Sequence, residues 1–150
     1  MHVVRTINQT LPFILSAAVL SIFDRALKAL VTMPQFDSVQ LIPDFFHIAY
    51  SLNTNAAFSI ALPSALYVGL FVIALCVIAG LWIVQGGVST PILRIAGMLL
   101  FIGALSNMYD RIVYGGVIDM LAVPRLGACN LADMYIVAGA ALWGFFLLRR

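Results

Sequence analysis

Three aspartates stand in contexts that could support acid–base chemistry. Asp119 lies among apolar residues in Gly-Gly-Val-Ile-Asp-Met-Leu, a setting that raises the proton affinity of a carboxyl group. Asp133 lies in Cys-Asn-Leu-Ala-Asp-Met-Tyr, and Asp24 lies in a long apolar run. Two close carboxyl groups share one proton, so one can activate a water molecule while the other protonates a peptide carbonyl. Paired carboxylates could therefore hydrolyse a peptide bond here.

The other common hydrolytic chemistries find little support in this sequence. It contains no Ser/His/Asp order, no Ser/Lys pair in a convincing context and no metal-ligand spacing. We therefore expect neither a metal ion nor another cofactor. A structural explanation also exists for one acid, because Asn130 and Asp133 are spaced as a capping box that opens a helix.

Two pairs of polar residues, each four positions apart, accompany these acids. Asp24 and Lys28 share one helix face in the favourable order, with the acid N-terminal. The pair could neutralise itself near the membrane boundary or could support a site. Asn107 and Arg111 share a face in Ser-Asn-Met-Tyr-Asp-Arg, which alone could be a polar helix end that meets water. We expect an acceptor for Arg111 that is remote in sequence, because an unpaired guanidinium there would be costly.

The elements that must position these residues are membrane helices. The chain has 150 residues, of which 63% are hydrophobic and 9% charged, whereas a soluble domain has about 25% charged residues. Four stretches approach the ~20 apolar residues of a spanning helix: 11–31, 62–85, 91–108 and 132–148. With a net charge of +2 and no dense basic cluster, nucleic acid is not an expected partner. We predict a single integral-membrane domain over residues 1–150.

Two long connectors, 32–61 and 109–131, separate these stretches, and β-prone runs within the first predict a small strand element. The predicted fold class is an all-α membrane protein with four transmembrane helices and a small periplasmic β element. Four spans place both termini on one side, and the segment 32–61 has no Lys or Arg. The positive-inside rule then places both termini in the cytoplasm and both long connectors outside.

Five short motifs, in order, resemble those of the lipoprotein signal peptidase family, also called signal peptidase II. Asp24-Arg-Ala-Leu-Lys28 resembles the family's first-span Asp-x-x-x-Lys motif. The segment that begins at Asn53, Asn-Thr-Asn-Ala-Ala-Phe, resembles its Asn-Thr-Gly-Ala-Ala-Phe box, with asparagine in place of glycine. Ser106-Asn-Met-Tyr-Asp-Arg111 resembles Gly-Asn-x-x-Asp-Arg, with serine in place of glycine.

The last two motifs, Val117-Ile-Asp119 and Asn130-Leu-Ala-Asp133, resemble the segments that carry the family's catalytic aspartates. The resemblance implies an aspartyl endopeptidase whose catalytic pair is Asp119 and Asp133. It also implies that six further residues support the site or position substrate: Asp24, Lys28, Asn53, Asn107, Arg111 and Asn130. The segment after Asp119, Met-Leu-Ala-Val-Pro, lacks the second acid and the aromatic residues common in the family.

The family also implies a substrate and a location. The substrate would be a pro-lipoprotein that is cut just before its diacylglyceryl-modified cysteine. The protein would lie in the bacterial inner membrane, in contact with membrane lipid, with its active site toward the periplasm. Globomycin-type cyclic peptides would inhibit it. The implied fold has four transmembrane helices, a small outward β element and a flexible outer loop.

Two other functions are compatible with parts of the sequence. A small transporter or ion-translocating protein could use intramembrane Asp and Lys as a relay, but it predicts polar residues continuing along the spans. The stretch 62–84 contains almost none. A non-catalytic membrane scaffold, or a family member without activity, is the second alternative, and the retention of Asp119 and Asp133 argues against it.

Overall fold

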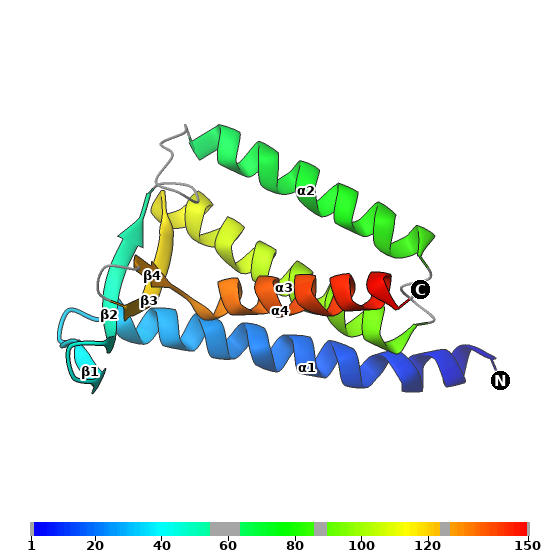
Figure 1. Ribbon diagram of the computed structural model, residues 1–150, viewed down its shortest axis with the longest axis horizontal. Helices are drawn as coiled ribbons and strands as arrows, with labels where there is room; N and C mark the ends of the chain where they lie inside the picture. The colour runs from blue at the N-terminus through cyan, green and yellow to red at the C-terminus, as the bar shows by residue number, and fades with distance from the viewer. Residues whose placement is uncertain (1, 55–63, 86–89, 124–126, 150) are drawn as a thin grey trace.

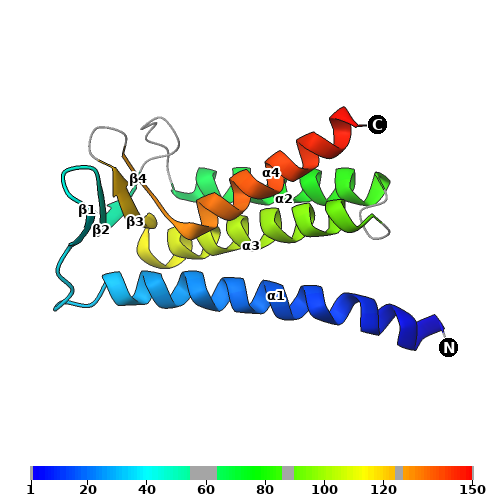
Figure 2. The same ribbon diagram turned by 60° about the horizontal axis from the view of Figure 1, so that its bottom comes forward.

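Long helices lie alongside one another, and a small sheet caps one end of them. The computed structural model describes residues 2–54, 64–85, 90–123 and 127–149. In chain order its elements are α1 (His2–Val31), β1 (Val39–Ile42), β2 (Phe46–Asn53), α2 (Ser64–Val84), α3 (Pro91–Tyr114), β3 (Val117–Val123), β4 (Gly127–Cys129) and α4 (Leu131–Leu148). Both termini lie at the end opposite the sheet (Figures 1 and 2). The predicted combination of helices with a small β element is confirmed.

Helix α3 occupies the centre and contacts α1, α2 and α4. Its approach to α4 is close because Gly103 has no side chain: a Cβ there would lie 2.5 Å from the backbone oxygen of Ala132. Small residues commonly allow such contacts between membrane helices. Asn107 lies one turn beyond Gly103, and Asp133 follows Ala132. The crossing therefore brings the polar ends of the two helices together.

Helix α3 is longer than the sequence predicted. The predicted span ended at residue 108, whereas the helix continues to Tyr114, so Asp110 and Arg111 lie within it. The helix ends at Gly115, whose φ of 72° is a left-handed conformation that costs glycine little. The apolar stretch was bounded too early, although the shared face predicted for Asn107 and Arg111 already extended the helix as far as Arg111. Charged side chains do not end a helix when other elements supply their partners.

The sheet is antiparallel, with strand order β1-β2-β3-β4. The register of β2 and β3 pairs Ser51 with Asp119, and Asn53 with Val117. Because side chains alternate along a strand, Asn53 and Asp119 project from the same face. Ile118 lies on the other face of β3 and packs in a buried cluster with Val31, at the end of α1.

Among the described residues, three helices are long and apolar enough to cross a membrane: Ala65–Val84, Pro91–Tyr114 and Leu131–Leu148. Helix α1 is not one of them, and it carries Asp24, Arg25 and Lys28 in its last two turns. Three of the four predicted spans are thus supported by length and composition. The spanning role of α1 stays a prediction.

Candidate active site

Asn130 links the two predicted catalytic aspartates. It is fully buried at the start of α4, and its amide nitrogen donates to Asp119 Oδ1 at 2.7 Å. Its amide oxygen accepts from the backbone N–H of Asp133 at 3.0 Å, and its own backbone N–H donates to Asp133 Oδ2 at 3.3 Å. The expected capping box is therefore present. Asn130 therefore caps helix α4 and also binds the carboxyl groups of both Asp119 and Asp133.

Two further asparagines bind the remaining carboxyl oxygens. Asn53 on β2 donates from Nδ2 to Asp119 Oδ2 at 3.1 Å. Asn107 on α3 donates from Nδ2 to Asp133 Oδ1 at 2.7 Å. Each carboxyl group therefore accepts one hydrogen bond at each of its oxygens, which restricts its rotation. Amides suit this role because they hold a carboxyl group without adding charge.

The environments of the two aspartates differ. Asp119 is 2% exposed on β3, whereas Asp133 is half-buried at the start of α4. Burial raises the pKa of Asp119 above its ordinary value, and the charge of Asp133 raises it further. The hydrogen bonds from Asn130 and Asn53 and the charge of Lys28 act in the opposite direction without cancelling the rise. Asp119 therefore keeps its proton to a higher pH than an ordinary carboxyl group does.

Beside the aspartates lies a buried ionic cluster formed by Asp24, Arg25 and Lys28 of α1 and Asp110 of α3. Lys28 Nζ lies 2.7 Å from Asp110 Oδ2 and 3.4 Å from Asp24 Oδ2. Arg25 lies 2.6 Å from Asp110 Oδ1 and 3.1 Å from Asp24 Oδ2. Each acid thus contacts both cations, and the cluster has no net formal charge. Such balance is needed because an unpaired charge in a membrane helix is costly.

The two acids of the ionic cluster also hold the backbone next to the catalytic candidates. Asp110 Oδ2 accepts the backbone N–H of Ile118, the residue before Asp119, at 3.2 Å. Asp24 Oδ1 accepts the backbone N–H of Ala132, the residue before Asp133, at 3.2 Å. Both Asp24 and Asp110 are completely buried. The cluster therefore ties the segments that carry the catalytic candidates to α1 and α3.

Arg111 lies on α3 beside α2. Its side chain is buried, and its guanidinium carbon lies 4.1 Å above the ring of Tyr67. An aromatic face attracts a cation, so this contact helps to hold Arg111 between the two helices. The sequence predicted a carboxylate or backbone acceptor, which stays a prediction. Asp110 points elsewhere, as expected, since it binds Lys28 and Arg25.

The predicted site residues fall into two groups. The structure brings most of them together through the contacts above: Asp24, Lys28, Asn53, Asn107, Asp119, Asn130 and Asp133. Arg111 is placed against α2 instead. Asn55, which replaces the glycine of the family motif, lies outside the described residues.

Three residues of the ionic network were missed by the predicted site: Arg25, Ser106 and Asp110. The Ser106 hydroxyl donates to Asp24 Oδ2 and accepts from Arg25 Nη2 at 2.6 Å. From the sequence, Ser106 was interpreted only as a mild replacement of the glycine in the family motif Gly-Asn-x-x-Asp-Arg. A signal for Asp110 did exist, since Gly115-Gly116 is a helix stop. Extending the third span to that stop would have made Asp110 an intramembrane charge.

The described residues contain no group of three or more His, Cys, Asp or Glu side chains that could hold a metal ion. What they do contain is two carboxyl groups, one of them deeply buried, joined through one asparagine. A pair of this kind can exchange protons with a water molecule. Apolar helices that can cross a membrane, with a carboxyl pair at one end, define a membrane protein with a candidate acid–base site.

Comparison with known proteins identifies the family. A family model for signal peptidase II matches residues 16–149. A lipoprotein signal peptidase of Pelotomaculum thermopropionicum is 38% identical, covering 91% of each chain, and one of Ectopseudomonas mendocina is 30% identical, covering 88% of this chain and 85% of its own. A solved bacterial membrane enzyme superposes with a TM-score of 0.78 at 30% identity, covering 92% of this chain and 88% of its own. The chain belongs to the signal peptidase II family, and the predicted resemblance is confirmed.

Proposed function

We propose that this protein is an aspartyl endopeptidase that removes signal peptides from pro-lipoproteins by cutting before the diacylglyceryl-modified cysteine. Membership of the signal peptidase II family supports the reaction and the substrate class. The single observation that carries the site is the bridging of Asp119 and Asp133 by Asn130. The ion-translocating alternative is not favoured, because the charged residues of the ionic cluster bind one another at the sheet end.

The two aspartates divide the acid–base work in this proposal. Asp133, the more exposed, takes a proton from a water molecule as the water oxygen attacks the scissile carbonyl carbon. Asp119, whose pKa is raised by burial, gives its proton to the carbonyl oxygen. In the second step the proton held by Asp133 passes to the amine of the lipid-modified cysteine as the C–N bond breaks. The carbonyl group of the released signal peptide re-forms as part of a carboxylic acid. One hydroxyl proton of the tetrahedral intermediate returns to Asp119 in this step.

We also propose that α1 is a fourth membrane span and that both termini are cytoplasmic. The charges of α1 fit this arrangement because Asp24, Arg25 and Lys28 form a neutral cluster with Asp110. Arg94 lies in the first turn of α3 and Arg149 is the C-cap residue of α4, both at the end of the bundle where the termini lie. The positive-inside rule then places the sheet and the site toward the periplasm of the inner membrane.

We expect a cysteine added after the C-terminus to react with a membrane-impermeant maleimide only from the cytoplasmic side. The background is Cys76→Ala with Cys129→Ala, which removes the native thiols. A cysteine at Ser38, exposed between α1 and β1, provides the matched control and should react from the periplasmic side. Periplasmic labelling of the C-terminal cysteine would contradict this topology.

The reconstituted protein should cleave a diacylglyceryl-modified precursor and leave the same precursor with a free cysteine uncut. Mass spectrometry of the released peptide should show that it ends at the residue before the modified cysteine. Chelators should leave the rate unchanged, and a globomycin-type cyclic peptide should block it. Equal cleavage of the unmodified precursor would refute the substrate class. Loss of activity to a chelator, with recovery on addition of zinc, would refute the carboxylate mechanism.

A further inference from the structure

The guanidinium group of Arg25 joins the two acids that hold the catalytic segments in place. Arg25 Nη1 donates to Asp110 Oδ1 at 2.6 Å, and Nη2 donates to Asp24 Oδ2 at 3.1 Å. Asp110 in turn accepts the backbone N–H of Ile118, and Asp24 accepts that of Ala132. We propose that Arg25 is a positioning residue that sets the distance between the two segments carrying the catalytic aspartates. This role rests on the proposed peptidase function.

Lys28, the other cation of the ionic cluster, holds the two acids unequally. Its Nζ donates to Asp110 Oδ2 at 2.7 Å but lies 3.4 Å from Asp24 Oδ2, which is longer than a well-formed hydrogen bond. The N–H groups of an ammonium also rotate about their stem, whereas a guanidinium is planar and its N–H groups have fixed directions. Arg25 can therefore fix the separation of Asp24 and Asp110, while Lys28 mainly supplies charge.

Contacts with α3 hold the guanidinium plane of Arg25. Its Nη2 also donates to the hydroxyl of Ser106 at 2.6 Å, and that hydroxyl donates to Asp24. The ring of Tyr109 lies against the guanidinium, with its centre 5.1 Å from Cζ. Ser106 and Tyr109 both belong to α3, so the position of Arg25 is defined relative to this helix. A glycine at position 106, as in the family motif, would have no hydroxyl to accept this hydrogen bond.

A shift of either acid would reach the catalytic pair through one peptide unit. Ile118 directly precedes Asp119, and Ala132 directly precedes Asp133. The two carboxyl groups are joined only through hydrogen bonds of 2.7 Å and 3.3 Å to one asparagine, so they move apart when the segments do. Reacting groups must be held to within about 0.5 Å of the productive geometry. Arg25 therefore affects the chemical step through Asp24 and Asp110.

Arg25→Lys retains the positive charge and removes the planar fork of N–H groups. We expect kcat to fall by about 10- to 100-fold, the effect of displacing reacting groups by up to about 1 Å. KM should be unchanged, because the bonds of Arg25 are to the acids and to Ser106 rather than to substrate. Rates are measured on the purified full chain with a diacylglyceryl-modified precursor, and thermal unfolding shows that the variant is folded. A folded Arg25→Lys protein with the kcat of the parent would overturn the role.

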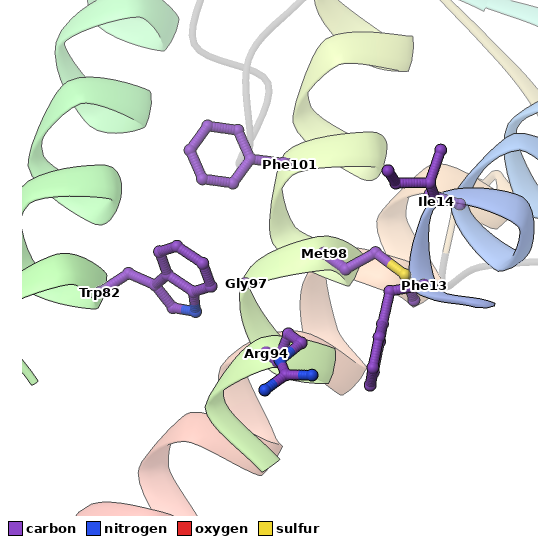
Figure 3. Close-up of a pocket in the computed structure, with 8 residues that line it drawn as sticks. Phe13, Ile14, Trp82, Arg94, Gly97, Met98 and Phe101 are labelled. Carbon is purple, nitrogen blue, oxygen red and sulfur yellow. The ribbon is translucent and has the colours of Figure 1, made fainter. Parts of the chain in front are cut away.

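Arg94→Lys is the matched control for this substitution. Arg94 also lies against an aromatic ring between α1 and α3, with its guanidinium carbon 4.8 Å from the ring centre of Phe13. Figure 3 shows these two residues beside an apolar groove of about 340 Å³, at the end of the bundle away from the aspartates. The control therefore alters a contact between the same two helices, far from the ionic cluster, and should keep the kcat of the parent. Equal losses of kcat in the two variants would contradict a positioning role for Arg25.

Chemical rescue separates the shape of the guanidinium from its charge. Arg25→Ala removes a side chain that is 32% exposed and that borders a cavity of about 210 Å³, so a small solute can reach its place. N-Ethylguanidinium matches the missing part of the side chain and should restore kcat. Ethylammonium carries the same charge without the fork and should not. Equal recovery with both solutes, or no recovery with either in a folded Arg25→Ala protein, would overturn the role.

Amide hydrogen exchange tests the same role without measuring activity. In Arg25→Lys the amides of Ile118 and Ala132 should exchange faster than in the parent, because their acceptors are no longer held. In Arg94→Lys both amides should exchange at the rate of the parent. Unchanged exchange in Arg25→Lys would refute the role of Arg25 while leaving the peptidase function intact. A parent protein that leaves the precursor uncut would instead refute the peptidase function, and exchange would still decide whether Arg25 holds the two segments.

Discussion

Asp119→Asn and Asp133→Asn will each reduce cleavage of a lipid-modified precursor by about 10³-fold or more, without unfolding the protein. Asparagine has nearly the shape of aspartate, and its amide oxygen can still accept one of the two hydrogen bonds that each carboxyl group accepts. An amide side chain cannot take up and give back a proton near neutral pH, and the proposed mechanism requires both of each aspartate in every turnover. Rates are measured on purified variants in detergent or vesicles, with thermal unfolding as the test of folding.

The controls for this prediction follow from the pair acting as a unit. The double variant should be little worse than either single one, because removing one partner already prevents the shared proton transfer. Asp37→Asn makes the same chemical change at an exposed connector residue and should leave the rate unchanged. A folded Asp119→Asn protein with near-normal turnover would refute the mechanism.

The pH profile of the parent should be bell-shaped, since one of the two carboxyl groups must be ionised and the other protonated. Activity falls at high pH as Asp119 loses its proton, and it falls at low pH when both carboxyl groups of the pair are protonated and neither can take a proton from water. Because burial raises the pKa of Asp119, the alkaline limb should lie above the pH at which an ordinary carboxyl group ionises. Asp119→Asn should remove that limb from whatever activity remains.

Among single substitutions of the cations in the ionic cluster, Lys28→Met is expected to lower the free energy of unfolding most, by about 3–5 kcal/mol. It breaks a buried ion pair by removing one partner. Lys28 is 2% exposed and contacts both Asp24 and Asp110, which are completely buried. Its loss leaves two carboxylates with Arg25 as the remaining cation of the cluster. Unfolding of the variant can be followed by circular dichroism during titration with a denaturing detergent.

Two matched controls follow from the charge balance within the ionic cluster. Arg25→Met removes the other cation, whose side chain is 32% exposed, so water compensates part of the loss and the destabilisation should be smaller. Lys28→Met combined with Asp24→Asn restores neutrality and should recover part of the stability lost by Lys28→Met alone. A Lys28→Met protein as stable as the parent would show that the cluster does not hold these helices together.

Local patterns in the sequence were sufficient for several features. The i, i+4 spacing of Asp24 and Lys28 predicted their shared face, and they form an ion pair at 3.4 Å. The spacing of Asn130 and Asp133 predicted a capping box, which is present. Both interactions lie within one helix or its cap, where helical periodicity alone determines which side chains meet.

Features that depend on contacts between distant segments were not predictable in the same way. The sequence stopped the third span before Asp110, because the cations that neutralise this acid lie on α1, more than 80 residues away. Ser106 was treated as a minor change for the same reason, since its partners are Asp24 and Arg25. No local pattern records a partner that only the packing of two helices supplies.

The sequence by itself determined that apolar helices form, because 63% of the residues are hydrophobic and occur in long runs. The spacing of Asn130 and Asp133 also placed one acid at the start of a helix. Only the tertiary structure decided that Asn130 joins Asp119 and Asp133, since this depends on two separate contacts. One is the antiparallel pairing that turns Asp119 toward the face of Asn53. The other is the crossing of α3 and α4 at Gly103, where the absence of a side chain lets the two backbones touch.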